Sequence, residues 1–114
     1  MARIRLTAGK VEMTATLNAG QTAKALLGAL PLSGRANRWG DEVYFDVPLQ
    51  LPPENPQATV PSGTIAYWPD GPALCIFFGQ TPYSPVNVLG TLDGDPKEWA
   101  KVQSGQTVIV QAAG

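Results

Sequence analysis

Seven side chains beside predicted turns have types that could hold a ligand. A ligand pocket is usually an apolar concavity with a few converging polar groups. Here aromatic rings would form the walls of a shallow groove, with an arginine at its rim and a glutamate beside it. The candidate ligand-binding residues are Arg38, Trp39, Glu42, Tyr44, Tyr67, Trp68 and Phe78.

The same aromatic residues could instead be ordinary core residues. We expect a core role for Phe78, as for Phe45 and Trp99. Arg38 and Trp39 lie in a glycine-flanked segment, and the sequence supports a binding role and a structural role equally for both.

Several kinds of chemistry are excluded by the residue types present. The chain has no histidine, which removes Ser-His-Asp and Cys-His catalysis and every zinc site that contains histidine. The single Cys75 lies in an apolar run and is expected to pack as a small hydrophobic residue. Asp41 and Glu42 should point to opposite faces of a strand, and residues 93–95 lack the further ligands of a calcium loop. We therefore expect no metal and no cofactor.

Length and composition fit one globular domain over residues 1–114. Apolar residues make up 44% and charged residues 15%, while eleven prolines and twelve glycines favour many turns and short strands. The sequence has no stretch near the ~20 apolar residues of a membrane span. Its first residues do not resemble a signal peptide, so we expect a cytoplasmic protein without a membrane partner.

The net charge of −1 gives no general reason to bind nucleic acid. Residues 1–40 carry six Lys or Arg and one acid, whereas residues 41–114 carry two Lys or Arg and eight acids. Because the basic residues are dispersed, we expect the two parts to neutralise each other and predict no nucleic-acid partner. The oligomeric state stays open.

A central hairpin organises the predicted fold. Residues 64–68 are β-branched and aromatic, and residues 73–78 form a continuous apolar run typical of a strand buried on both faces. Between them, Pro-Asp-Gly-Pro at 69–72 is a turn sequence. The same reasoning predicts strands at 3–7, 11–17, 42–47, 86–92 and 107–111, helices at 22–30 and 96–102, and loops at 32–40, 49–61 and 79–85.

Short strands at this spacing, with two helices, predict a mainly β fold: a closed β-barrel with the helices capping its ends. Asn18 or Thr22 is expected to cap the first helix. In the first hairpin, a turn at Ala8-Gly9 would set Leu6 opposite Val11 and place the apolar side chains on one face.

Several motifs resemble cyclophilins. Residues 63–72, Gly-Thr-Ile-Ala-Tyr-Trp-Pro-Asp-Gly-Pro, followed by Ile-Phe-Phe at 76–78, resemble the cyclophilin segment Gly-x-Leu-x-Met-Ala-x-x-Gly-Pro that runs into Gln-Phe-Phe-Ile. The stretches 36–45, 73–79 and 84–88 are similar to a family of small prokaryotic cyclophilin-like proteins of uncharacterised function. This resemblance extends over nearly all 114 residues and implies a cyclophilin-like barrel.

The resemblance also implies two functions. The first is a module that binds a peptide or small-molecule ligand. The alternative is a divergent peptidyl-prolyl cis-trans isomerase, in which Arg38 would be the catalytic residue and Phe78 would line the proline pocket. The Gln-Gly-Gly-Asp run of the isomerases and their pocket histidine have no counterpart in this chain. A third possibility is self-association through exposed aromatic side chains.

Overall fold

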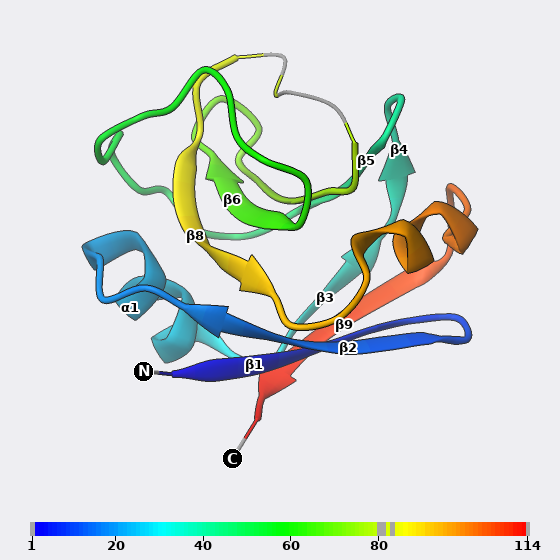
Figure 1. Cartoon of the computed structure of the whole chain (residues 1–114). Coiled ribbons are helices and arrows are strands. Elements are labelled where there is room, and N and C mark those ends of the chain that lie inside the picture. The colour runs from blue at the N-terminus through cyan, green and yellow to red at the C-terminus, as the bar shows by residue number, and fades with distance from the viewer. Residues whose placement is uncertain (1, 80–81, 83, 114) are drawn as a thin grey trace.

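Nine strands form one antiparallel sheet within the residues that the computed structural model describes, namely 2–79, 82 and 84–113. The sheet has the order β3-β9-β1-β2-β8-β6-β7-β5-β4 and curls into a nearly closed barrel (Figure 1). The strands are β1 (Arg3–Ala8), β2 (Val11–Leu17), β3 (Leu32–Arg35), β4 (Asn37–Arg38), β5 (Glu42–Asp46), β6 (Thr64–Trp68), β7 (Ala73–Phe77), β8 (Asn87–Leu92) and β9 (Thr107–Ala112). The predicted mainly β barrel is confirmed.

Two short helices flank the barrel. Helix α1 (Gln21–Ala29) and the 3₁₀ helix η1 (Pro96–Lys101) lie on opposite sides of the barrel (Figure 1). Trp99 of η1 is fully buried, and Val102 follows it into the core. Both helices were expected from the sequence within about one residue of these bounds.

The central hairpin β6–β7 is buried on both faces, as the sequence predicts. Its inward side chains, Ile65, Tyr67, Leu74 and Ile76, belong to the barrel core. Its outward side chains form a second apolar cluster with Val86, against which Tyr44, Val60 and Trp68 pack. Successive side chains of a strand point to opposite faces, so one continuous apolar run supplies residues to both clusters.

The first hairpin has a different register from the predicted one. Leu6 pairs with Met13 and not with Val11, and the turn consists of Gly9 and Lys10. Gly9 has a φ of +58°, a conformation that glycine adopts without steric cost, and this moves the turn by one residue. The shift in pairing is two residues, so every side chain keeps its predicted face.

The predicted loop at 32–40 instead contains both edges of the sheet. Strand β3 pairs with β9, and strand β4 pairs with β5. The sequence of β3, Leu-Ser-Gly-Arg, does not predict a strand, because glycine and serine are typical of loops. Gly34 is needed there, since an added Cβ would lie 2.7 Å from the Phe45 ring.

Helix α1 is capped by a side chain from a distant segment. The predicted caps were Asn18 or Thr22, but the N-cap is Gly20 and makes no side-chain cap hydrogen bond. The Glu54 carboxylate accepts hydrogen bonds from the backbone N–H groups of Gln21 and Thr22, both at 2.8 Å, and from the Thr22 hydroxyl at 2.6 Å. These bonds, the hydroxyl first, hold the pKa of Glu54 below its usual range.

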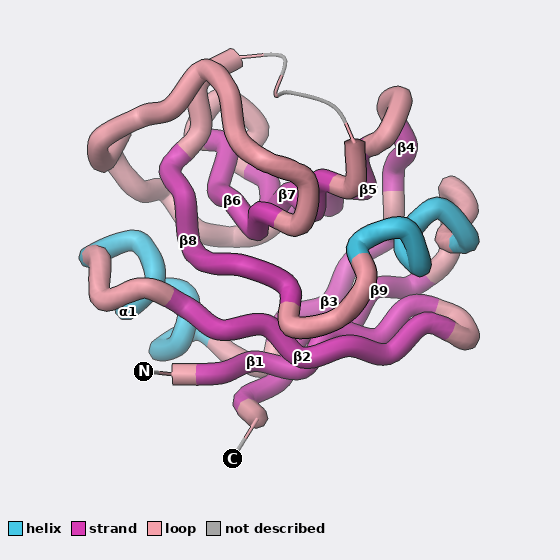
Figure 2. Tube along the Cα trace, in the orientation of Figure 1, coloured by secondary structure: helices cyan, strands magenta, loops and turns pink. Residues whose placement is uncertain are grey.

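The segment at 47–63 is irregular, as predicted for 49–61, and arches beside β6 and β8 (Figure 2). It pairs with the residue just before β8 through an isolated bridge between Gln57 and Val86. The Tyr67 hydroxyl donates to the Leu49 carbonyl at 2.6 Å and accepts from the Leu51 N–H at 3.0 Å. The predicted loop at 79–85 lies partly outside the described residues.

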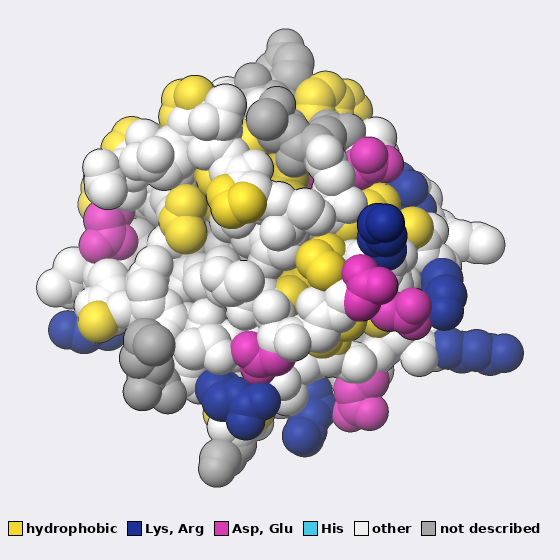
Figure 3. Space-filling view, viewed as in Figure 1, with side chains coloured by type: hydrophobic (Ala, Val, Ile, Leu, Met, Phe, Trp, Pro, Cys, Tyr) yellow, Lys and Arg dark blue, Asp and Glu magenta, His cyan; other side chains and the backbone are white. Residues whose placement is uncertain are grey.

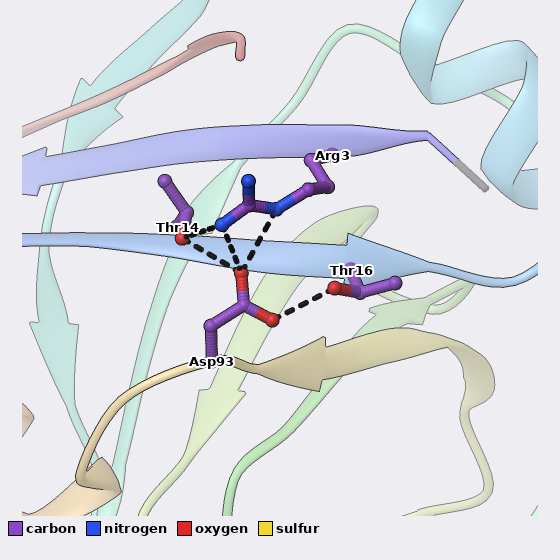
Figure 4. A network of polar contacts seen from close by, with 4 residues as sticks. All are labelled: Arg3, Thr14, Thr16 and Asp93. Carbon is purple, nitrogen blue, oxygen red and sulfur yellow. Dashed lines mark hydrogen bonds and ion pairs between the residues drawn. The ribbon is translucent and has the colours of Figure 1, made fainter.

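A polar network ties β1 and β2 to the turn after β8 (Figure 4). The Asp93 carboxylate accepts hydrogen bonds from Thr14 and Thr16, both at 2.7 Å, and from Arg3 at 3.0 Å. The threonine hydroxyls, more than the arginine, lower the pKa of Asp93. Arg3 and Asp93 come from opposite ends of the sequence, and basic and acidic side chains lie next to one another on this face of the molecule (Figure 3).

Candidate functional site

A pocket of about 200 Å³ opens on the outer face of β5, β6 and β7. Alternation along these strands turns one set of side chains outward, away from the barrel core. Residues 39, 82, 84 and 86 complete the described part of the wall. The described lining residues are Trp39, Glu42, Tyr44, Trp68, Cys75, Phe77, Pro82, Ser84 and Val86.

Glu42 is the acidic group of this pocket and is only 6% exposed. It lies on β5 opposite Phe77 of β7, next to an apolar surface. Burial raises the pKa of Glu42, and a hydrogen bond with the Cys75 side chain partly opposes that rise. The carboxyl group therefore keeps its proton to a higher pH than an exposed glutamate does.

Cys75 is the neighbour of Glu42 in the pocket floor and is almost fully buried. Burial, and then the negative charge of Glu42, raises the pKa of the Cys75 thiol well above its usual range. A thiol held in its protonated form is a weak nucleophile. The pair thus provides a buried proton donor and acceptor and does not provide an activated cysteine.

Aromatic rings form most of the remaining wall. The rings of Tyr44 and Trp68 are 6.5 Å apart between centroids and stand at 83° to each other. The indole N–H of Trp68 donates a hydrogen bond to the Ser84 hydroxyl, which fixes the orientation of that ring. Trp39 lies at the mouth and is 45% exposed.

Four of the seven candidate residues line this one pocket: Trp39, Glu42, Tyr44 and Trp68. Tyr67 and Phe78 belong instead to the barrel core, as we had expected for Phe78. Tyr67 turns inward because it lies one residue before Trp68 on the same strand.

Arg38 also lies away from the pocket lining. Its guanidinium donates hydrogen bonds to the carbonyl oxygens of Ala100 at 3.1 Å, Val102 at 2.8 Å and Gly40 at 3.2 Å. The guanidinium carbon lies 5.1 Å from the centroid of the Phe78 ring. Arg38 thus links β4 to the segment that ends η1.

Sequence reasoning missed the pocket residues Cys75, Phe77, Pro82, Ser84 and Val86. Within β7, the continuous apolar run concealed which residues face outward. The alternation of side chains along β5 could have located Cys75, since Tyr44 faces outward, Tyr44 pairs with Cys75, and paired residues share a face.

Two further properties bear on the kind of site. Within the described ranges, no three acidic or cysteine side chains are grouped closely enough to hold a metal ion. Across the same residues, no helix has the length and apolar content needed to cross a membrane.

The fold and the outward-facing pocket define the class of protein. Residues 2–111 match the Cyclophilin-like family, and the chain belongs to that family. The solution structure of the hypothetical protein AF2241 from Archaeoglobus fulgidus is similar over 98% of this chain and 95% of its own, with 34% identity and a TM-score of 0.82.

A more distant likeness is the structure of McbB in complex with tryptophan, with 16% identity and a TM-score of 0.75. That match includes 97% of this chain but 45% of the McbB chain, and at this identity it shows the fold alone. No curated protein sequence matches the chain.

Proposed function

We propose that this protein is a binding module that holds a small ligand, or one side chain of a peptide, in the pocket on the outer face of β5, β6 and β7. The observation that supports this proposal is a concave, largely aromatic wall that contains one buried carboxyl group, Glu42. Such a wall supplies apolar contact area, and a single converging polar group supplies orientation. A cytoplasmic location remains a prediction from the sequence.

Of the two similar structures, one supports a binding role. AF2241 is itself a hypothetical protein. McbB, in contrast, was determined with tryptophan bound, so a barrel of this kind accompanies a small aromatic ligand in at least one protein. Tryptophan is therefore a reasonable first probe for this chain.

The isomerase hypothesis gains no support from this arrangement. It assigns catalysis to Arg38, whose guanidinium is engaged with three backbone carbonyl groups and the Phe78 ring. An arginine that stabilises a twisting amide must direct its donors at the substrate.

The binding proposal can be tested by following backbone amide chemical shifts while tryptophan and a library of small apolar compounds are added. We expect shifts concentrated on β5, β6, β7 and residues 84 and 86. Trp39→Ala should weaken the binding several-fold, because it removes a ring from the mouth of the pocket.

Ile109→Ala is the matched control, since Ile109 is a large apolar side chain of similar exposure, 37%, on β9. It should leave the affinity unchanged. Shifts that map to other strands, or no response from any compound, would refute the proposal.

A further inference from the structure

The charge of the pocket constrains its ligand. Among the lining residues that the structure describes, Glu42 is the only acidic or basic side chain apart from the neutral thiol of Cys75 and the phenol of Tyr44. None of the ion pairs in the described part of the chain includes Glu42. A buried carboxylate without a counter-ion repels an anion, whereas a cation would offset its desolvation.

The rings around Glu42 favour the same sign of charge. A cation within about 6 Å of a ring centroid is attracted by the negative face of the ring, and more strongly when it is desolvated. Tyr44 and Trp68 stand at 83° to each other, so the pocket has two ring surfaces of different orientation, with Trp39 at its mouth. Mutually perpendicular rings can contact a compact cation from more than one side.

The size of the pocket limits the ligand further. Its volume of about 200 Å³ lies below the roughly 300–1,000 Å³ of pockets that hold drug-sized molecules. Trp39, which lines the pocket, is 45% exposed, so the pocket reaches the surface and does not need to enclose a whole ligand. A compact charged head fits these limits better than an extended ligand.

We infer that the pocket selects a small organic cation, an alkylated ammonium group, with the Glu42 carboxylate as its counter-ion and the rings of Tyr44, Trp68 and Trp39 as cation–π partners. This rests on the proposed binding function and specifies its ligand class. The weakly hydrated alkyl groups would contact the apolar wall of the pocket, and the positive charge would neutralise the carboxylate. Inorganic cations, which keep a strong hydration shell, are not expected to bind.

The test compares choline with 3,3-dimethylbutan-1-ol, in which carbon replaces the ammonium nitrogen so that shape is kept and charge is lost. Both are titrated by calorimetry or by amide chemical shifts, at a pH well above the raised pKa of Glu42. We expect choline to bind at least about tenfold more tightly than the alcohol. Sodium chloride at the same ionic strength controls for general screening.

Substitutions at Glu42 and Tyr44 assign the preference to named groups. Glu42→Gln keeps the shape of the side chain and should remove most of the preference for choline without changing the affinity of the alcohol. Glu12→Gln is the matched control, because Glu12 is an exposed acid on β2, and it should change neither affinity. Tyr44→Leu should weaken choline several-fold, while Tyr44→Phe, which keeps the ring, should not.

The outcomes separate this inference from the binding proposal. Equal binding of both compounds in the pocket would overturn the cation preference and leave the binding function standing. Binding of library compounds but of neither choline nor the alcohol would also overturn the inference alone. A preference for choline that persists in Glu42→Gln would remove the carboxylate from its assigned role.

Discussion

Glu42 shows how one residue can be costly for the fold and useful in a site. Its neighbours on the same face are the Cys75 thiol and the Phe77 ring, neither of which is a cation. A leucine or glutamine in its place would avoid the desolvation of a charge. Stability therefore does not explain a glutamate at this position, which supports the proposed binding role.

The first prediction at the residue scale concerns the pH dependence of stability. The pKa of Glu42 is raised in the folded state, so between the ordinary glutamate value and the raised value the folded protein holds a proton that the unfolded chain has released. The stability that Glu42 contributes is therefore complete below that window and is lost as the pH rises through it.

Glu42→Gln removes this dependence. We expect the variant to be more stable than the original protein at neutral pH, on the order of 1 kcal/mol, and to lose that advantage in acid. Urea unfolding at a series of pH values measures the difference. An advantage that is constant over the whole series would contradict the assignment.

At the scale of elements, the barrel depends on close approach between strands. Gly90 of β8 pairs with Leu17 of β2 and with Ile65 of β6, beside an irregularity in the β6–β8 pairing. A Cβ added at Gly90 would lie 2.1 Å from the Thr16 carbonyl oxygen. The backbone of β2 at Thr16 and Leu17, and not a flexible side chain, occupies the space.

Gly90→Ala should therefore destabilise the protein by about 3 kcal/mol. Gly28→Ala provides the opposite case, since Gly28 lies in α1 and a Cβ there would meet nothing within 4 Å. Removing the flexibility of glycine in a helix should stabilise the protein by about 0.5–1 kcal/mol. Thermal unfolding of both variants tests the pair, and similar effects of the two substitutions would contradict the packing described for β8.

At the scale of the whole molecule, one buried amide joins three segments that are far apart in the sequence. Asn87 of β8 is fully buried, and its NH₂ group donates to the Thr22 hydroxyl at 3.1 Å and to the Pro52 carbonyl at 3.0 Å. Its side-chain oxygen accepts from the Glu54 N–H at 2.8 Å. The irregular segment at 47–63 is thereby fixed to both α1 and the sheet.

Asn87→Ala would leave the partner groups of that amide unsatisfied, so we expect a loss of about 2–3 kcal/mol. Limited proteolysis should also cut the segment at 47–63 faster, because its opening would then cost less free energy. Asn37→Ala is the control: Asn37 is exposed, and its hydrogen bonds are long, at 3.4 and 3.5 Å. Equal cleavage of the two variants would show that Asn87 does not anchor the segment.

The site could be anticipated only in part. Alternation in β5 correctly separated Val43 and Phe45, which fill the barrel, from Glu42 and Tyr44, which face outward. The same argument did not reach Arg38, because two of its three partner carbonyls lie 62 and 64 residues away in the sequence. No local pattern reports contacts of that range.

The sequence by itself determined the local conformations: the central hairpin, both helices and the side of each long strand that faces the core. These follow from side-chain period, turn residues and proline, which act over a few residues. Only the tertiary structure decided that 32–38 supplies the two sheet edges, that Glu54 caps α1 and that the outer face of β5–β7 forms a pocket with residues 82, 84 and 86. The physical reason is that these features need backbone pairing and close approach between segments brought together when the sheet curls into a barrel.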